Sequence, residues 1–205
     1  MSKRDWPSDV HPESGSRLPP VVRDDLDEAG RRIFDNAADP DGTSYAGLHG
    51  PAGVRLHSPR LSEALGPVNR YLRRDAGIGP DLRELAILVT ARELDSQFEW
   101  AAHESAARRA GVSAEAIEII RHRSDVVGLS ERDEVVIRLG REMFGAHRVS
   151  PDTFARAHDL FGTRMLVDLV GVMGSYASTA SLLCAFDVQL HDDWEPGLPV
   201  TPPGA

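Results

Sequence analysis

The chain is short of cysteine, with Cys184 alone among 205 residues. One cysteine excludes an intramolecular disulfide, and it excludes any mechanism that passes electrons through two thiols of the same chain. Because Cys184 lies in a long apolar stretch, we expect its side chain to be a buried filler of the core.

Basic residues are also outnumbered, with 23 Lys and Arg against 32 Asp and Glu, and the formal net charge is −9 at pH 7. A nucleic-acid partner requires a basic face that pairs with phosphates. An anionic membrane surface likewise attracts basic segments. The charge balance therefore argues against nucleic acid and against a membrane as partners.

The chain has no apolar segment of the kind that begins a secretory signal, because residues 1–20 are rich in Pro, Ser and charge. The most apolar stretch, residues 166–186, is long enough to span a bilayer. Asp168 and several Ser and Thr within this stretch favour a buried helix of a soluble protein. We therefore expect a cytoplasmic protein.

Strand-like alternation of polar and apolar residues is missing, and the pattern is helical almost throughout, which predicts an all-α chain. At 205 residues with 41% apolar side chains, one globular domain is the default. We expect a mobile arm or intersubunit strap over 1–20, one helical domain over 21–194 and a flexible tail over 195–205.

Helix boundaries follow from the usual start and stop residues. Pro80 suits a first helical turn, and Gly111 ends the helix predicted over 97–110. Ser113 and Ser130 are expected to cap the two helices that follow, and a helix that begins at 151 is expected to end near Gly162. Two earlier helices are predicted over 24–38 and 59–75.

The segment between those two earlier helices, residues 39–59, is rich in Gly and Pro, which predicts irregular structure. Irregular segments of that length in compact domains often carry function.

The segment that carries chemistry includes Ser96, Glu99 and His103, which share one face of a helix. Glu99 and His103 are one turn apart, so a hydrogen bond between them would hold the imidazole in one tautomer. A helical hairpin would fold Glu84 of the preceding helix back toward the same point. Two carboxylates and an imidazole in an apolar environment suit proton transfer, because burial moves their pKa values toward neutrality.

This pattern resembles the core motif of the carboxymuconolactone decarboxylase and alkyl hydroperoxidase D superfamily. In the peroxidase branch a glutamate is followed, twelve residues on, by Cys-x-x-Cys-x-x-x-His. Here Glu84 and His103 match the glutamate and the histidine, while Ser96 and Glu99 stand where the two cysteines would be. The thiol pair is absent, and the Glu-x-x-x-His form is similar to the decarboxylase branch.

The resemblance is strongest over 61–121 and extends toward Phe186, and this chain adds roughly sixty residues in front of the family core. It implies an alkyl hydroperoxidase D-like helical bundle that assembles into trimers or hexamers. It also implies a cofactor-independent lyase that acts on a small lactone or activated carboxylate. His103 would be the proton shuttle oriented by Glu99, with Glu84 as a second acid or an orienting partner.

Four more residues are candidates for binding the substrate: Ser96, Trp100, Tyr176 in the last helix and His49 in the Gly/Pro-rich segment. Each has a structural alternative. Ser96-x-x-Glu99 is also the pattern of a capping box, Trp100 also suits core packing, and His49 also suits a surface loop. Glu84 also suits a first-turn acid that complements the helix dipole.

Glu99 and His103 would also supply two ligands of a metal site. No HExxH pattern or second histidine cluster completes such a site, so we expect no metal. A non-catalytic binding or scaffold protein of the same family remains an alternative function, and a peroxidase-type protein that depends on Cys184 is a weaker one.

Overall fold

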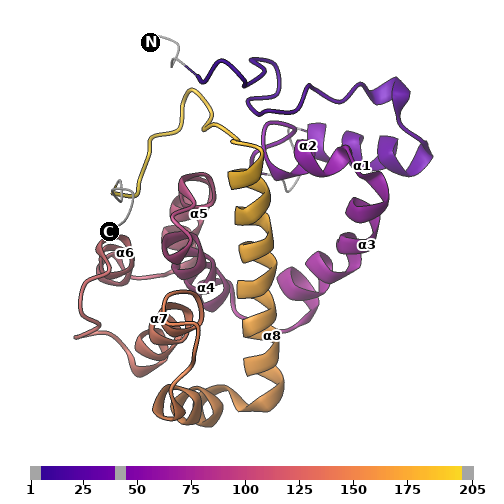
Figure 1. Ribbon diagram of the computed structural model, residues 1–205. Coiled ribbons are helices and arrows are strands. Elements are labelled where there is room, and N and C mark those ends of the chain that lie inside the picture. Colours follow the sequence, from indigo (N-terminus) through magenta and orange to yellow (C-terminus); the bar gives the residue numbers. More distant parts are fainter. Residues whose placement is uncertain (1–5, 40–44, 200–205) are drawn as a thin grey trace. The chain divides into compact units, whose positions relative to one another are not determined.

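A computed structural model describes residues 6–39 and 45–199 (Figure 1). Over these residues the chain forms eight α-helices and no strand, with one isolated bridge between His11 and Ser16. The all-α prediction is confirmed for this part of the chain. The elements in order are η1 (Arg23–Asp25), α1 (Glu28–Ala38), α2 (Pro51–Leu56), α3 (Pro59–Arg70), η2 (Tyr71–Asp75), α4 (Pro80–Glu93), α5 (Gln97–Ala110), α6 (Ala114–His122), α7 (Glu131–Phe144) and α8 (Pro151–Ala185).

The chain divides into two compact units. Unit 1 contains the described residues up to 70 together with 181–195. Unit 2 contains residues 71–180 and the described residues from 196 onward. The predicted single domain over 21–194 is not tested by this division and stays a prediction.

Unit 1 joins α1, α2 and α3 to the described N-terminal segment and to residues 181–195. The backbone N–H of Arg17 donates to the carbonyl of Phe186 at 2.8 Å, and that of Gln189 donates to the carbonyl of Gly15 at 2.8 Å. The described part of the predicted arm therefore pairs with the segment after α8. The mobility that we expect for this arm stays a prediction.

The Gly/Pro-rich segment 39–59 was expected to lack helix, and this expectation is wrong for α2. Pro51 occupies the first turn of this six-residue helix, where a missing N–H costs nothing. The proline that argued against a helix is thus the residue that begins one.

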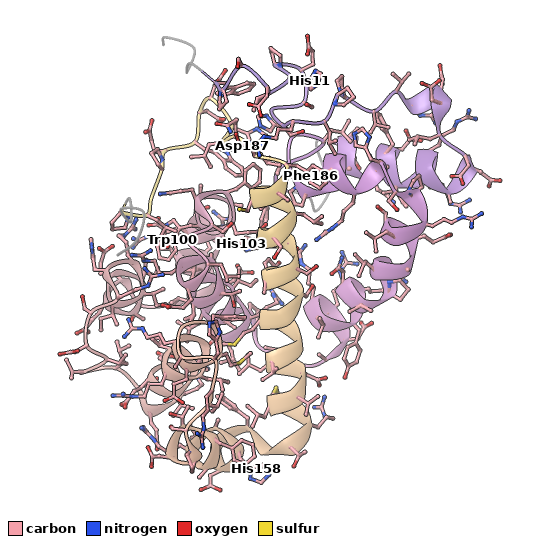
Figure 2. All side chains as sticks on the ribbon, in the orientation of Figure 1. His11, Trp100, His103, His158, Phe186 and Asp187 are labelled. Carbon is pink, nitrogen blue, oxygen red and sulfur yellow. The ribbon has the colours of Figure 1, made fainter. Side chains whose placement is uncertain are left out.

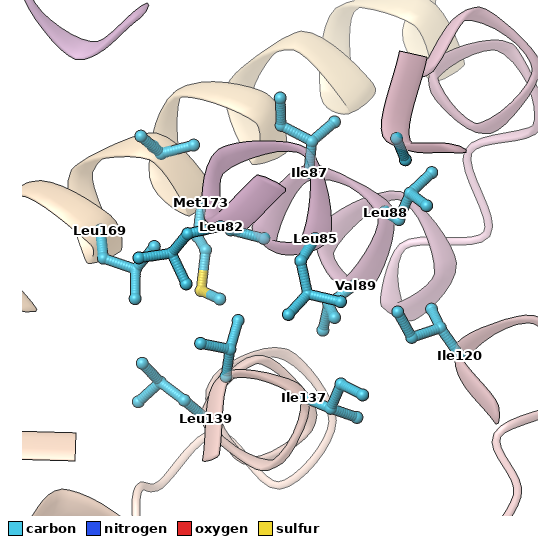
Figure 3. Packing of buried hydrophobic residues seen from close by; sticks show 14 of the residues in the cluster. Leu82, Leu85, Ile87, Leu88, Val89, Ile120, Ile137, Leu139, Leu169 and Met173 are labelled. Carbon is cyan, nitrogen blue, oxygen red and sulfur yellow. The ribbon is translucent and has the colours of Figure 1, made fainter. Parts of the chain in front are cut away.

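The core of unit 2 surrounds α4. This helix is buried on all sides, and Figure 3 shows its apolar side chains packed among residues of α6, α7 and α8. Gly140 of α7 allows the close approach, because a Cβ there would overlap the side chain of Val89. A helix enclosed on all sides holds its polar residues at fixed positions, and Glu84 is one of them.

The predicted helix ends in unit 2 are confirmed. α4 begins at Pro80, and α5 stops at Gly111, whose φ of +98° is left-handed. The Ser113 hydroxyl accepts from the N–H of Ala116 at 3.1 Å, and the Ser130 hydroxyl accepts from the N–H of Asp133 at 3.2 Å. Each such cap contributes about 1 kcal/mol.

The last helix, α8, changes direction at Gly162, where φ is +68° and ψ is 169°. α8 is long and apolar enough to span a membrane by length and composition alone, a test that buried core helices also pass, and 44% of its most apolar window is buried. Cys184, in its last turn, is exposed, so the expected buried filler is wrong. Ala180 and Leu183 occupy the buried face of this end of the helix instead.

Candidate active site

Three ionisable side chains of unit 2 meet in the interior, from the helical hairpin of α4 and α5. Glu84 is 2% exposed, Glu99 4% and His103 5%, the last labelled on α5 in Figure 2. Asp95, with a φ of +50°, lies in the tight connection, and the N–H of Ser96 returns to the carbonyl of Ala91 at 2.8 Å. The hairpin brings Glu84 back to the Glu99–His103 face, as the sequence predicts.

The imidazole of His103 has a carboxylate at each nitrogen. Its Nδ1 lies 2.8 Å from Oε2 of Glu84, which is a hydrogen-bond distance. Its Nε2 lies 3.7 Å from Oε2 of Glu99, which is an ion-pair distance. The sequence predicts Glu99 as the residue that orients the ring, but the short bond goes to Glu84.

The charge state of Glu84 is set by two opposing effects. Burial alone would raise the pKa of the Glu84 carboxyl, but the hydrogen bond and the charge of His103, with the charges of Arg83 and Arg73, bring it below its usual value. The expectation that burial moves this group toward neutrality is therefore wrong. Glu84 is a carboxylate at neutral pH and can only accept a hydrogen bond.

The tautomer of His103 follows from this. Since Glu84 accepts, Nδ1 must carry a proton, and Nε2 is the nitrogen that gains and loses one. Nε2 faces Glu99. The geometry therefore presents one basic nitrogen, supported from behind by an anion, next to a second carboxyl group.

Tyr176 reaches the same cluster from α8. Its ring meets the His103 ring edge to face, with centroids 5.1 Å apart and planes at 88°. Burial raises the pKa of Tyr176, and the negative charges of Glu99 and Glu84 raise it further. The hydroxyl therefore remains a proton-bearing donor at neutral pH. The sequence names this residue as a candidate, and the structure brings it to His103.

Arg83 is a member of the cluster that the sequence analysis gives no role. Its Nη2 lies 3.5 Å from Oε1 of Glu84, and its Nη1 donates to the carbonyl of Arg73 at 2.9 Å. Residues that are adjacent on a helix point in different directions, so spacing alone predicts no contact between Arg83 and Glu84. The adjacency of Arg83 and Glu84 in the sequence is the only hint that the two charges interact.

Ser96 begins α5, but its side chain makes no capping hydrogen bond. The capping-box interpretation of Ser96-x-x-Glu99 is therefore wrong, because Glu99 faces His103 instead of the helix end. Ser96 lies one turn before Glu99, and its binding of a substrate stays a prediction.

Trp100 is completely buried in the core of unit 2. Its Nε1 donates to Oε2 of Glu104 at 2.9 Å, and the guanidinium of Arg121 lies 5.0 Å from the ring centroid. These contacts give the indole a packing role. Its role as a substrate-binding residue stays a prediction.

His49 belongs to unit 1, where it stacks on His191 with ring centroids 4.2 Å apart. Its Nε2 lies 2.8 Å from the carbonyl of Gln189, and Trp6 meets its ring edge to face. Burial and the neighbouring charge of His191 lower the pKa of His49. The structure brings His49 into this second histidine cluster, and its role in binding a substrate stays a prediction.

Among the residues that the structure describes, no group of three or more His, Cys, Asp and Glu side chains is arranged to hold a metal ion. What the described cluster offers is proton chemistry. It combines an acceptor nitrogen, two carboxyl groups, a phenol and two arginine charges.

Residues 59–136 match the model of the carboxymuconolactone decarboxylase family. This confirms the family predicted from the sequence. The match contains Arg83, Glu84, Glu99 and His103, while Tyr176 and His49 lie outside it. No curated protein matches the chain.

Proposed function

Residues 59–136 of this chain match the carboxymuconolactone decarboxylase family model, and from that premise we propose that the protein is a lyase. It would remove CO2 from a small carboxylated lactone or a similarly activated carboxylate. The observation that carries the proposal is the His103 imidazole between two buried carboxyl groups, with Nδ1 bound to Glu84 and Nε2 facing Glu99. The proposal deals with a small-molecule substrate, and involves neither nucleic acid nor membrane.

The reaction needs one electron sink and one proton. When the C–C bond to the carboxylate breaks, its electron pair passes to the carbon framework, and a conjugated lactone carbonyl holds the charge as an enolate. The step then needs no cofactor, because the substrate itself takes up the electrons. The carbon that lost CO2 must receive a proton, and a positioned acid contributes about 10²–10⁴-fold to such a step.

His103 is the residue that would deliver this proton, from Nε2. The Glu84 carboxylate at Nδ1 stabilises the imidazolium form before transfer and fixes the ring orientation. Glu99, 3.7 Å from Nε2, would take up a proton from solvent after each turnover and pass it to the imidazole. Tyr176, whose ring lies against that of His103 and whose hydroxyl keeps its proton, would donate to the developing enolate oxygen.

The experiment is a turnover assay on a panel of carboxylated lactones. In each of them, loss of the carboxylate as CO2 leaves a carbanion that is conjugated with the ring carbonyl. CO2 release is measured in D2O, and the product is examined by NMR for one deuteron on the carbon that lost CO2. We expect His103→Ala and Glu99→Gln to lower the rate by about 10²–10⁴-fold. Glu118→Gln is the matched control, since its side chain is 51% exposed.

Two results would contradict the proposal. Folded His103→Ala and Glu99→Gln proteins that turn over a substrate at the wild-type rate would remove the assignment of the site. A panel whose members raise the melting temperature but release no CO2 would favour the alternative, a non-catalytic binding protein of the family.

The proposal includes a homo-oligomer, a trimer or hexamer as the family resemblance implies. Phe154, Leu160 and Val167 of α8 are 55%, 41% and 63% exposed in the single chain, and exposed apolar groups of this kind favour association. Light scattering should give a multiple of 22.3 kDa, and a 22.3 kDa particle at micromolar concentration would contradict this part.

A further inference from the structure

Glu84 is held from two sides. Its Oε2 takes the hydrogen bond from Nδ1 of His103 at 2.8 Å, while Oε1 lies 3.5 Å from Nη2 of Arg83. The Glu84 side chain is 3% exposed and that of Arg83 18%. A carboxylate with a different partner on each oxygen cannot leave this plane without losing both contacts, so Arg83 fixes the orientation in which the carboxylate faces the imidazole.

Arg83 is itself fixed by a segment of unusual geometry. Its Nη1 donates to the carbonyl of Arg73, inside η2, which is a π-helix. Its Nε is buried and has no hydrogen-bond partner among the described residues, so the contacts with Arg73 and Glu84 are what hold the guanidinium. Single π-helical turns are frequent at functional sites, because they displace the backbone carbonyls from the α-helical register.

The π-helix is in turn anchored to α8 within unit 2. The Tyr71 hydroxyl donates to the carboxylate of Asp168 at 3.1 Å, and Arg164 bridges Asp168 and the carbonyl of Ala76, both at 3.0 Å. A continuous series of contacts therefore runs from Asp168 through η2 to Arg83.

We propose that Arg83 is a positioning residue of the site, which keeps Glu84 ionised and oriented so that His103 carries its proton on Nδ1 and exchanges protons only at Nε2. The role uses two features of the guanidinium. Its charge, at Nη2, balances the charge of Glu84, and the hydrogen bond from Nη1 to the carbonyl of Arg73 fixes the group in place. The inference deepens the proposed function, on which it rests for the use of the imidazole in catalysis.

The charges around Glu84 come from every element packed on it. Arg83 lies on α4 itself, Arg73 on η2 and His103 on α5, and all three favour the ionised carboxylate. Glu99 on α5 and Tyr176 on α8 complete the surroundings, the former adding negative charge. Because Arg83 is the cation whose guanidinium nitrogen contacts a Glu84 oxygen, its removal should have a larger effect on Glu84 than removal of more distant arginines.

The test is an NMR titration that needs no substrate. The side-chain carboxyl ¹³C shift of Glu84 is followed against pH in the full-length protein, with the resonance assigned from Glu84→Gln. In Arg83→Gln we expect the midpoint of the Glu84 titration to move upward by about one pH unit. We also expect the downfield proton resonance of the His103 Nδ1–H to broaden or disappear, because its acceptor is no longer held.

Two further variants separate charge, geometry and general damage. Arg83→Lys retains the charge and should restore the low Glu84 midpoint even where Arg83→Gln folds poorly. Arg74→Gln removes an exposed charge from the same π-helix and should leave both signals unchanged. A Glu84 midpoint that is the same in wild type and Arg83→Gln, or that moves as much in Arg74→Gln, would overturn the inference. Since the readout is a titration, its failure is distinct from a failure of the CO2 assay.

Discussion

Each unit shields a histidine from solvent, fully for His103 and partly for His49, and the nearest charged or ionisable neighbours of the two differ. In unit 2, His103 lies between two carboxyl groups, 2.8 Å from Glu84 and 3.7 Å from Glu99. In unit 1, His49 lies against a second imidazole, that of His191, with ring centroids 4.2 Å apart. Negative neighbours stabilise a protonated ring, whereas a like charge and burial oppose it.

This difference separates a ring suited to proton transfer from a ring suited to structure. His49 offers Nε2 to the carbonyl of Gln189, and His191 offers Nε2 to the carbonyl of His49, both at 2.8 Å. In each bond a ring N–H donates to a backbone carbonyl, and the two bonds connect segments that are distant in sequence. Burial of a histidine is therefore no guide to function by itself; the charge of its neighbours decides.

The largest expected effect comes from removing a buried partner. Glu84→Leu takes the acceptor from His103 and should cost about 3–5 kcal/mol in the free energy of unfolding. His191→Leu, which removes the ring stacked on His49, should cost about 1 kcal/mol, since one hydrogen bond to a backbone carbonyl is lost. Denaturant titration measures both, with Glu118→Leu as an exposed control. Equal costs for the two substitutions would break the distinction between the sites.

A smaller effect is expected at Gly15, where φ is +62° and a Cβ would overlap the His49 ring. Gly15→Ala should lower the free energy of unfolding of unit 1 by about 1–3 kcal/mol. Gly77→Ala is the matched control, because φ there is +77° but no atom lies within 4 Å of the added Cβ. If the two substitutions cost the same, the contact with His49 contributes nothing beyond backbone strain.

The smallest effects concern pH. Both histidine and glutamate contributions to stability are lost as the pH falls, but in different pH ranges. The pKa of His49 is below its ordinary value of 6.5, so the unfolded chain takes up the proton first and the stability of unit 1 falls as the pH drops below about 6.5. The pKa of Glu84 is below its ordinary value of 4.5, so its contribution is complete above that pH and is lost only as the pH falls through the lower folded value.

Hydrogen-exchange protection at pH 7 and pH 5.5 measures this difference, after correction for intrinsic rates. Protection in unit 1 should decline more than protection in unit 2. His49→Asn should remove the extra decline, and His122→Asn, at an exposed position, should not. An equal decline of protection in both units would contradict the attribution of the pH effect to His49.

Local sequence signals predicted most of the helix ends of unit 2. Pro80, Ser113, Ser130 and Gly111 act within one or two turns of the residues that they affect, so their consequences require no tertiary information. α2 was missed because the Gly and Pro content of its segment was given more weight than the position of Pro51. Whether a proline ends or begins a helix depends on its neighbours.

The sequence predicted which residues meet at the candidate site better than it predicted which of their atoms are in contact. Helical spacing places Glu99 and His103 together, and the hairpin returns Glu84 to them. Spacing does not give the distance between two facing helices. The sequence therefore favoured Glu99 as the residue that orients the ring and left Glu84 as a second acid or an orienting partner, whereas the structure bonds Glu84 to Nδ1. Arg83 was missed for the same reason, because its contact with Arg73 depends on a π-helical turn that no residue pattern indicates.

The segment after residue 195 has a practical consequence. The side-chain amide of Gln97 holds Leu198 at both its carbonyl and its N–H, at 2.7 and 3.0 Å, as a neighbouring strand would. Leu198 is buried, and Gly197 lies so close to the Trp100 indole that no side chain would fit there. A shortened protein that stops before Pro196 would leave this indole open to water, so its fluorescence emission would shift to the red, and tryptophan fluorescence can monitor the docking of the segment in solution.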